Sequence, residues 1–244
     1  MYIDSVRDYL LFIDTETSGL PRKWNVPYSK DKNWPHAVQM AWVVYTRNGD
    51  MVKQENHYIS DCDFNIEPSA VKVHGITRKF LNDNGVPRVE VLSKLEEDLN
   101  QYQPIVAGHF MELDYHVIGA DFSRIGKDNP LKNFPVFCTM LATRHLVRNP
   151  AVNYLRLNEL YTMLFGKKFH FQHNALADAQ ATAECFFLLI RRNDINEEQL
   201  EKQSRITIEG YEVTDNRSRT LQLILLIVLI ILIIAWIWVV KRSF

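Results

Sequence analysis

The chain has 244 residues, of which 47% are hydrophobic, and it carries 28 basic and 29 acidic side chains. This length supports one sizeable hydrophobic core with at most a small appendage. The formal net charge of −1 argues against a general electrostatic grip on a long polyanion, so any nucleic acid would have to be held locally.

The first predicted element is a buried strand at the start of the stretch LLFIDTETSGLP, residues 10–21. Leu10 to Ile13 is apolar on both faces, and Asp14 and Glu16 follow at its end, two residues apart. Side chains two apart in a strand point to the same face. Two carboxylates side by side at the edge of a core repel each other and lose hydration. Divalent cations are the usual way to offset that cost, so the pair predicts further carboxylates nearby.

A polar, proline-bearing loop is expected next, over residues 21–36, and it contains three aromatic side chains. Trp24, Tyr28 and Trp34 are compatible with two roles. They could stack on the bases of a single strand, as aromatic residues do in many proteins that bind single-stranded nucleic acid. They could equally pack the loop against the domain, and the sequence leaves both roles open.

Two strands are expected at residues 37–46 and 51–60, and the turn RNGD between them predicts a β-hairpin. Residues 63–77 are expected to be irregular. Helices and strands then alternate along the chain. The expected elements are a helix at 89–102, a strand at 104–109, a helix at 112–126, a strand running into a helix over 133–147, and an amphipathic helix at 174–192. This order indicates an α/β sheet whose first hairpin is antiparallel.

Two more aspartates occur near the starts of predicted helices. Asp114 follows a predicted strand, and Asp178 lies early in the helix at 174–192, preceded by His173. Four acidic residues from three separated segments, together with a histidine, make a site for two hard cations with oxygen ligands. Residues five apart do not share a helix face, so His173 is expected just before the first turn, directed toward the metals rather than bound to them.

These residues resemble a known family. The stretches FIDTETSGL and VHGIT, Asp114, and the spacing from His173 to Asp178 are similar to the DnaQ-like 3′–5′ exonucleases of the DEDDh class. That family includes the epsilon subunits of bacterial DNA polymerase III and ribonuclease T. The resemblance covers about residues 8–192, and it implies an RNase H-like α/β domain with a mixed five-stranded sheet flanked by helices. Asparagine at position 174, where a sister class has tyrosine, favours the histidine-bearing class.

The resemblance also implies a reaction and the residues that perform it. Two Mg²⁺ or Mn²⁺ ions would be held by Asp14, Glu16, Asp114 and Asp178, and His173 would be the general base. The pocket for the terminal nucleotide would be lined by Thr15, Gly19, Leu20, His74 and Ile76. The implied activity is two-metal hydrolysis that releases nucleoside monophosphates from the 3′ end of nucleic acid, with single-stranded DNA favoured.

One position departs from the family pattern. The second motif of the family usually reads H-N-x-x-F-D, whereas residues 109–114 of this chain read HFMELD. Asp114 is kept, but Phe110 replaces the usual asparagine, which affects either the rate or the substrate fit. His109 and His116 are expected to be structural or surface histidines. Lys167 and Lys168 fit a solvated turn, or alternatively a phosphate contact.

The C-terminal region has a different composition. Residues 223–240 contain no polar side chain, and the predicted span, residues 221–240, would be about 30 Å long as a helix, the thickness of a hydrocarbon core. Trp236 and Trp238 lie near one end, where interfacial aromatics are expected, and basic residues follow directly. The alternative is a buried core helix, but core helices are seldom apolar all round for this length. We therefore expect one transmembrane tail anchor.

These observations predict an exonuclease domain at residues 1–192, a charged helical end and linker at 193–220, and the anchor at 221–240. The three cysteines are widely spaced and lack CxxC spacing, which fits a reducing compartment, and the N-terminus shows no signal-peptide pattern. Both features favour a catalytic domain in the cytoplasm. The resemblance to bacterial epsilon-like chains favours a bacterial inner membrane.

The expected partners are the 3′ end of nucleic acid, the membrane, and replication or repair proteins. Two alternatives remain open. One is a weak or inactive member of the fold that serves as a nucleic-acid-binding module at the membrane. The other is an exoribonuclease, because the motifs do not distinguish deoxyribose from ribose.

Overall fold

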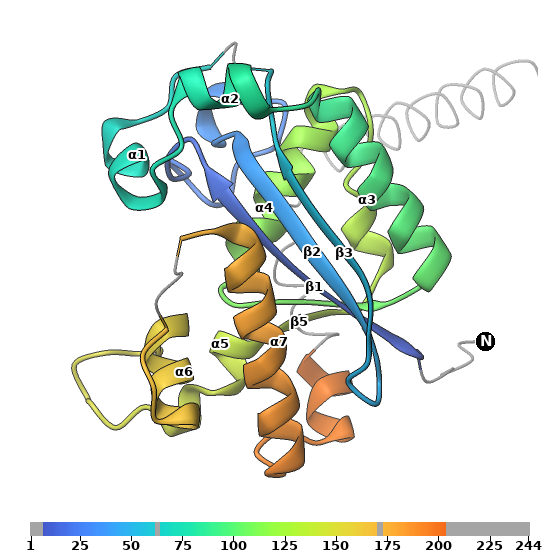
Figure 1. Ribbon diagram of the computed structural model, residues 1–244, viewed down its shortest axis with the longest axis vertical. Coiled ribbons are helices and arrows are strands. Elements are labelled where there is room, and N and C mark those ends of the chain that lie inside the picture. The colour runs from blue at the N-terminus through green and yellow to red at the C-terminus, as the bar shows by residue number, and fades with distance from the viewer. Residues whose placement is uncertain (1–6, 62–63, 170–172, 204–244) are drawn as a thin grey trace, which may run out of the picture. The chain divides into compact units, whose positions relative to one another are not determined.

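The computed structural model describes residues 7–61, 64–169 and 173–203, which lie within the unit Met1–Glu212. Within this part of the chain, five strands form one sheet in the order β3-β2-β1-β4-β5 (Figure 1). The strands are β1 (Tyr9–Thr17), β2 (Ala37–Thr46), β3 (Met51–Tyr58), β4 (Ile105–Gly108) and β5 (Val136–Cys138). β1, β2 and β3 are antiparallel neighbours, whereas β4 is parallel to both β1 and β5. The predicted mixed sheet and its antiparallel first hairpin are therefore confirmed.

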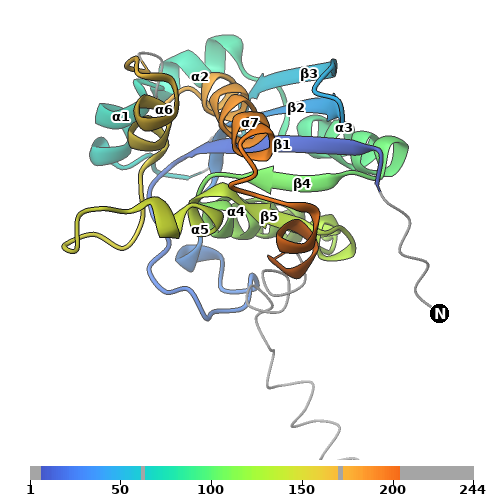
Figure 2. The same ribbon diagram turned by 90° about the horizontal axis from the view of Figure 1, so that it is seen from below.

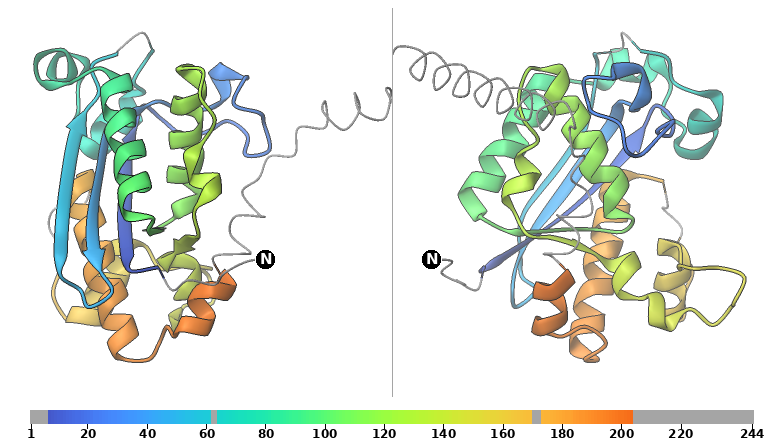
Figure 3. Two further views of the ribbon diagram at one scale, coloured as in Figure 1. Left: turned by 90° about the vertical axis from the view of Figure 1, so that its right-hand side faces the viewer. Right: turned by 180° about the vertical axis from the view of Figure 1, so that it is seen from behind.

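Helices cover both faces of this sheet. The α-helices are α1 (Pro68–His74), α2 (Arg78–Asn84), α3 (Arg88–Tyr102), α4 (Met111–Arg124), α5 (Thr139–Ala142), α6 (Leu157–Phe165) and α7 (Ala175–Arg191). Short 3-10 helices occur at η1 (Asp31–Asn33), η2 (Pro130–Asn133) and η3 (Arg144–Leu146), and residues 197–203 are helical. α7 lies on one face of the sheet, and α3 and α4 lie on the other (Figures 1 and 3).

The central strand β1 contributes side chains to two separate cores. Leu11 and Ile13 pack in the core that contains residues of α3 and α4. Leu10 and Phe12 pack in the core that contains residues of α7. Because side chains alternate along a strand, Asp14 and Glu16 lie on the α7 side of the sheet, and Thr15 lies on the α4 side. The sheet thus directs neighbouring residues of one motif toward two different helices.

The strand that was expected at Leu10 to Ile13 is longer than predicted. β1 continues to Thr17, so the two carboxylates lie within the strand rather than after it. Asp14 pairs with Ala41 and Glu16 with Gln39 on β2. The hydrogen bonds of the ladder are made by the backbone, so a change from apolar to acidic side chains does not end the strand.

The prediction that residues 63–77 are irregular was wrong, because α1 lies within them. Pro68 occupies the first turn of α1, where a missing N–H is tolerated, and Gly75 ends the helix with φ of 74°. Thr77 then caps α2 by accepting a hydrogen bond from the N–H of Phe80. α6 was not predicted at all. It packs against α7 in a small core that includes Leu160.

The loop after β1 is folded against α4 (Figures 2 and 3). Trp34 is 2% exposed, and its ring stacks on His116 of α4 with the centroids 4.7 Å apart. The hydroxyl of Tyr28 forms a 2.9 Å hydrogen bond with Nδ1 of the same histidine. Burial lowers the pKa of His116 to about 4, so this ring is neutral at physiological pH and acts as a packing residue. For Tyr28 and Trp34 the structure thus favours loop packing over base stacking.

The predicted membrane anchor at residues 221–240 lies outside the described residues, as does most of the predicted linker. Within residues 7–203, apart from the short gaps named above, no helix combines the length and the apolar character that a bilayer crossing needs.

Candidate active site

The candidate site forms where the end of β1 meets the first turns of α4 and α7. Asp114 is the fourth residue of α4, and Asp178 is the fourth residue of α7. Asp114 is oriented by β1, because Oδ1 accepts hydrogen bonds from the backbone N–H of Thr15 at 2.9 Å and from its hydroxyl at 2.7 Å. Thr15 can do this because it points to the α4 side, between two acidic residues that point to the α7 side.

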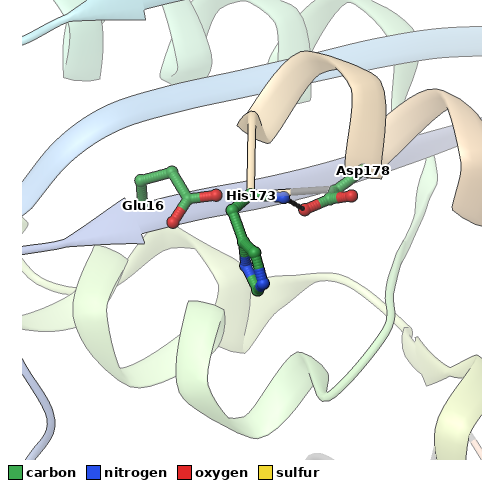
Figure 4. Close-up of side chains that lie close together, drawn as sticks. All are labelled: Glu16, His173 and Asp178. Carbon is green, nitrogen blue, oxygen red and sulfur yellow. Dashed lines mark hydrogen bonds between the residues drawn. The ribbon is translucent and has the colours of Figure 1, made fainter. Parts of the chain in front are cut away.

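His173 lies before the first turn of α7, as its spacing from Asp178 indicates. Asn174 is the N-cap of the helix, and its side chain accepts a 3.3 Å hydrogen bond from the N–H of Ala177. The backbone N–H of His173 donates to Oδ2 of Asp178 at 2.9 Å (Figure 4). A left-handed backbone conformation at His173, with φ of 67°, accompanies this contact. The turn therefore presents the imidazole beside the carboxylate of Asp178.

Glu16, His173 and Asp178 come close together although they belong to segments far apart in the sequence. One ligand atom from each lies within 4.8 Å of the others, and Figure 4 shows His173 between the two acidic residues, with its ring extending below them in this view. Oδ1 of Asp178 is buried and has no hydrogen-bond partner among the residues that the structure describes. A buried carboxylate oxygen without a partner is costly, so it points to a ligand that can approach it.

We refer to Asp14, Glu16, Asp114 and Asp178 as the carboxylate cluster. Burial is the main reason that the pKa of each member is raised. The pKa of Glu16 rises to about 8, and those of Asp114 and Asp178 rise to about 7. The charges of the other three members also raise the pKa of Asp14. These side chains thus repel one another when ionised.

The donor set of this cluster fits hard divalent cations. Carboxylate oxygens are the ligands that Mg²⁺ and Mn²⁺ prefer. A cation would offset the repulsion that raises the pKa values, and it would satisfy the unpartnered Oδ1 of Asp178. The sequence-based expectation of a metal site is therefore compatible with the geometry.

Gln39 supports the site, and the sequence reasoning did not identify it. Its side chain is fully buried on β2, opposite Glu16 in the ladder. Oε1 accepts a 3.2 Å hydrogen bond from the backbone N–H of Ala175, the first residue of α7. Nε2 donates to Oδ1 of Asn56 on β3 at 2.8 Å. The amide thus ties the start of α7 to the strand beside Glu16. The sequence signal for Gln39 was its position as the lone polar residue in the apolar run AVQMAWVV.

Arg156 is a second residue that the sequence reasoning missed. It directly precedes α6, and its charge lowers the pKa of His173 further, beyond the larger effect of burial. The neighbouring Leu155 is held by His109, whose Nε2 donates to the Leu155 carbonyl at 3.0 Å. Burial lowers the pKa of His109 to about 4, so its ring is neutral and structural, as expected. This link between the end of β4 and α6 brings the positive charge of Arg156 close to His173.

The residues predicted to line a nucleotide pocket have different environments. Leu20 is 69% exposed, whereas Ile76 is 6% exposed and packs in a small core with Val38 and Leu81. Thr15 is 7% exposed, and its hydroxyl is engaged by Asp114. Contact of these residues with a nucleotide stays a prediction.

Gly19 and His74 lie near the end of β1. A Cβ atom at Gly19 would lie 2.7 Å from the side-chain carboxyl carbon of Glu67, so a larger residue there would displace this side chain. Nε2 of His74 lies 3.2 Å from the backbone oxygen of Thr17. Burial lowers the pKa of His74, and His173 contributes to this shift. α1 is thus joined to the β1 end of the site.

Comparison with known proteins identifies a matching family. The family model RNase_T, described as Exonuclease, matches residues 11–186. A comparison with curated protein sequences gives no match.

Three solved structures illustrate the similarity of fold. Escherichia coli Exonuclease I in complex with a dT13 oligonucleotide has a TM-score of 0.62 at 19% identity, covering 76% of this chain and 42% of that one. The zinc-bound complex of E. coli Exonuclease I with single-stranded DNA has a TM-score of 0.63 at 20% identity, covering 80% and 42%. Exonuclease I from Methylocaldum szegediense has a TM-score of 0.62 at 20% identity, covering 79% and 42%. The chain therefore matches less than half the length of these proteins.

Proposed function

The chain belongs to the exonuclease family, and from this premise we propose that it removes nucleotides from the 3′ ends of nucleic acid by metal-dependent hydrolysis. The observation that carries the proposal is the convergence of the carboxylate cluster and His173 at the end of the central strand β1. The mutual repulsion of the carboxylates and the unpartnered Oδ1 of Asp178 have no evident structural purpose without cations. The products would be nucleoside monophosphates.

The proposed roles follow from the chemistry of each group. The carboxylate cluster would hold two Mg²⁺ or Mn²⁺ ions, which when bound activate a water and offset the charge that develops on phosphate and leaving group. His173 would accept the proton of that water at a ring nitrogen. Burial and the nearby Arg156 lower the pKa of His173, so the ring is neutral and can accept a proton at neutral pH.

Single-stranded DNA is the proposed substrate. The similar E. coli structures hold a dT13 oligonucleotide or single-stranded DNA, which supports this choice by analogy of fold. A nucleic-acid-binding module without activity would have no need of all four carboxylates and His173. An exoribonuclease has the same active-site chemistry and is distinguished only by substrate.

We also propose that residues 221–240 hold the catalytic domain at the cytoplasmic side of a membrane, with a bacterial inner membrane favoured. The support is the uninterrupted apolar run at residues 223–240. Replication or repair proteins are the partners suggested by the family resemblance.

The test uses the full chain in detergent with DNA and RNA strands labelled at either end. In the presence of Mg²⁺, a 3′ label should be released at once as a mononucleotide, while a 5′ label should persist in progressively shorter strands. EDTA should stop the reaction, and Asp178→Asn should be inactive. Release from the 5′ end would overturn the proposal. Binding of every strand without release would favour the binding module, and release from RNA alone would identify an exoribonuclease.

A further inference from the structure

The aromatic residues of the loop after β1 separate into two groups in the structure. Trp34 is buried, and Tyr28 is occupied by its hydrogen bond to His116. Trp24 is partly exposed, and its ring centroid lies 5.8 Å from that of Phe110, which is also partly exposed. These two rings form an aromatic surface that the loop packing does not fully cover.

This surface borders the candidate active site. Phe110 is the N-cap of α4, one helical turn before Asp114. Trp24 belongs to the loop that directly follows the strand bearing Asp14 and Glu16. Both rings are thus attached to the segments that supply the carboxylates.

Trp24 rests on a well-packed base. Its ring contacts the rings of Trp34 and His116, at centroid distances of 6.2 and 6.1 Å. Those two rings stack on each other and are buried. A ring that is already held in place loses little conformational entropy when a second ring stacks on it.

Phe110 shows a backbone feature that is typical of functional sites. Its φ is 67°, in the left-handed region, which is an uncommon conformation for a bulky residue. The family pattern has asparagine here, and asparagine tolerates this conformation well. Phenylalanine therefore occupies a position where the backbone disfavours it, beside the partly exposed Trp24.

We propose that Trp24 and Phe110 form a stacking platform for a nucleobase of the substrate strand, close to the bond that is cut. This inference rests on the proposed function. A strand whose phosphodiester reaches Asp114 must pass its neighbouring nucleotides over the residues that border Asp114. Since the net charge of the full chain is only −1, the protein has little general attraction for a polyanion, and stacking supplies affinity without charge. Aromatic stacking accepts any base, so the platform selects unpaired strands rather than a sequence.

The first experiment measures the binding of a 5′-labelled oligodeoxynucleotide to the full chain by fluorescence anisotropy, with Ca²⁺ replacing Mg²⁺ to slow hydrolysis. Trp24→Ala and Phe110→Ala should each raise the Kd by about 5- to 150-fold, the usual effect of losing one stacked base. With Mg²⁺, KM should rise while kcat changes by less than about threefold, because this contact is the same in ground and transition states. The matched control is Tyr102→Ala. Tyr102 forms a similar pair with Tyr9, with centroids 5.1 Å apart, at the opposite end of β1. Tyr102→Ala should bind the oligodeoxynucleotide with the Kd of the wild type.

A second experiment identifies the stacked nucleotide. Abasic sites are placed one at a time along the strand, and wild-type binding should weaken most at one position near the 3′ end. Trp24→Leu and Phe110→Leu keep apolar volume in the fold but remove the aromatic face. These variants should bind the intact strand weakly and should be insensitive to the abasic site at that position.

The outcomes separate the two proposals. A wild-type chain that neither binds nor shortens any strand overturns the proposed function, and the platform with it. A wild-type chain that shortens 3′ ends while all four platform variants keep wild-type Kd and KM overturns the platform alone. Equal sensitivity of wild type and variants to every abasic site also overturns it.

Discussion

Thr15 donates two hydrogen bonds to the same oxygen of Asp114, one from its backbone N–H and one from its hydroxyl. The two residues are 99 positions apart in the sequence. Both hydrogen bonds favour the ionised carboxylate and lower its pKa, whereas burial, the larger effect, raises the pKa to about 7. Thr15 therefore acts as a support for a proposed metal ligand, in addition to any contact it makes with a nucleotide.

Thr15→Val should lower kcat/KM by about 10- to 100-fold, the usual effect of losing a residue that orients a metal ligand. The half-saturating Mg²⁺ concentration should rise as well. Thr15→Ser keeps the hydroxyl and should stay within a few-fold of the wild type. Steady-state kinetics at several Mg²⁺ concentrations provide the measurement. Wild-type Mg²⁺ dependence in Thr15→Val would show that the backbone N–H alone orients Asp114.

Neutralising a member of the carboxylate cluster should separate activity from stability. Asp14→Asn or Asp178→Asn should abolish Mg²⁺-dependent release of nucleotides. In the absence of metal, each variant should have a Tm equal to or above that of the wild type, because a buried repulsion is removed. Asp128→Asn, which changes an exposed carboxylate beside Lys132, is the control and should keep full activity. Near-normal activity in either cluster variant would disprove the two-metal assignment.

The stability of the metal-free protein should depend on pH in the direction that the raised pKa values require. Ordinary carboxylates have pKa values of about 4, whereas Glu16 is raised to about 8, and Asp114 and Asp178 to about 7. The folded state therefore binds protons more tightly than the unfolded state. Stability should fall as the pH rises from about 4 to about 8.

The raised pKa values of these carboxylates should accordingly give a higher midpoint of urea unfolding in EDTA at pH 5.5 than at pH 8. Mg²⁺ should raise the midpoint mainly at pH 8, where the carboxylates are ionised. Glu16→Gln should reduce the difference between the two pH values. If the midpoint of Glu16→Gln in EDTA depends on pH as strongly as that of the wild type, the raised pKa of Glu16 is contradicted.

His173→Ala should lower turnover by about 10² to 10⁴, the usual contribution of positioned proton transfer, while Mg²⁺ activation stays nearly unchanged. At saturating Mg²⁺, which keeps the carboxylate cluster ionised, wild-type activity should fall at acidic pH, since a protonated imidazole cannot accept a proton, and the variant should lose this dependence. The lowered pKa of His173 places the acidic limb below the ordinary histidine value of about 6.5. His145→Ala removes an exposed histidine and serves as the control. Turnover within a few-fold of wild type in His173→Ala would assign proton transfer to another group.

Deleting residues 221–244 should move the protein from the membrane fraction to the soluble fraction. The release of 3′ nucleotides should continue, because every member of the site lies before residue 193. Fractionation followed by an activity assay tests both statements. Fusing residues 221–240 to a fluorescent protein should be sufficient for membrane localisation. A truncated chain that is folded but inert on all strands would mean that the deleted segment takes part in catalysis.

Local patterns in the sequence by themselves determine much of the site. The alternation of side chains along a strand places Asp14 and Glu16 on one face, and this holds wherever the strand lies. The spacing from His173 to Asp178 excludes a shared helix face, and Asn174 is the N-cap between them. These relationships depend on backbone geometry within a few residues, so a sequence is sufficient to read them.

The contacts that support the site depend on the tertiary structure. Gln39 and Ala175 are 136 residues apart, and only the packing of α7 on the sheet brings the amide to the start of the helix. The same is true of Trp24 and Phe110, since the loop after β1 must fold onto α4 before one tryptophan is buried and the other left partly exposed. Local periodicity says which face a residue occupies. The identity of the residue it meets there is decided by the energies of packing and hydrogen bonding between segments that are distant in the chain, and no local pattern encodes these.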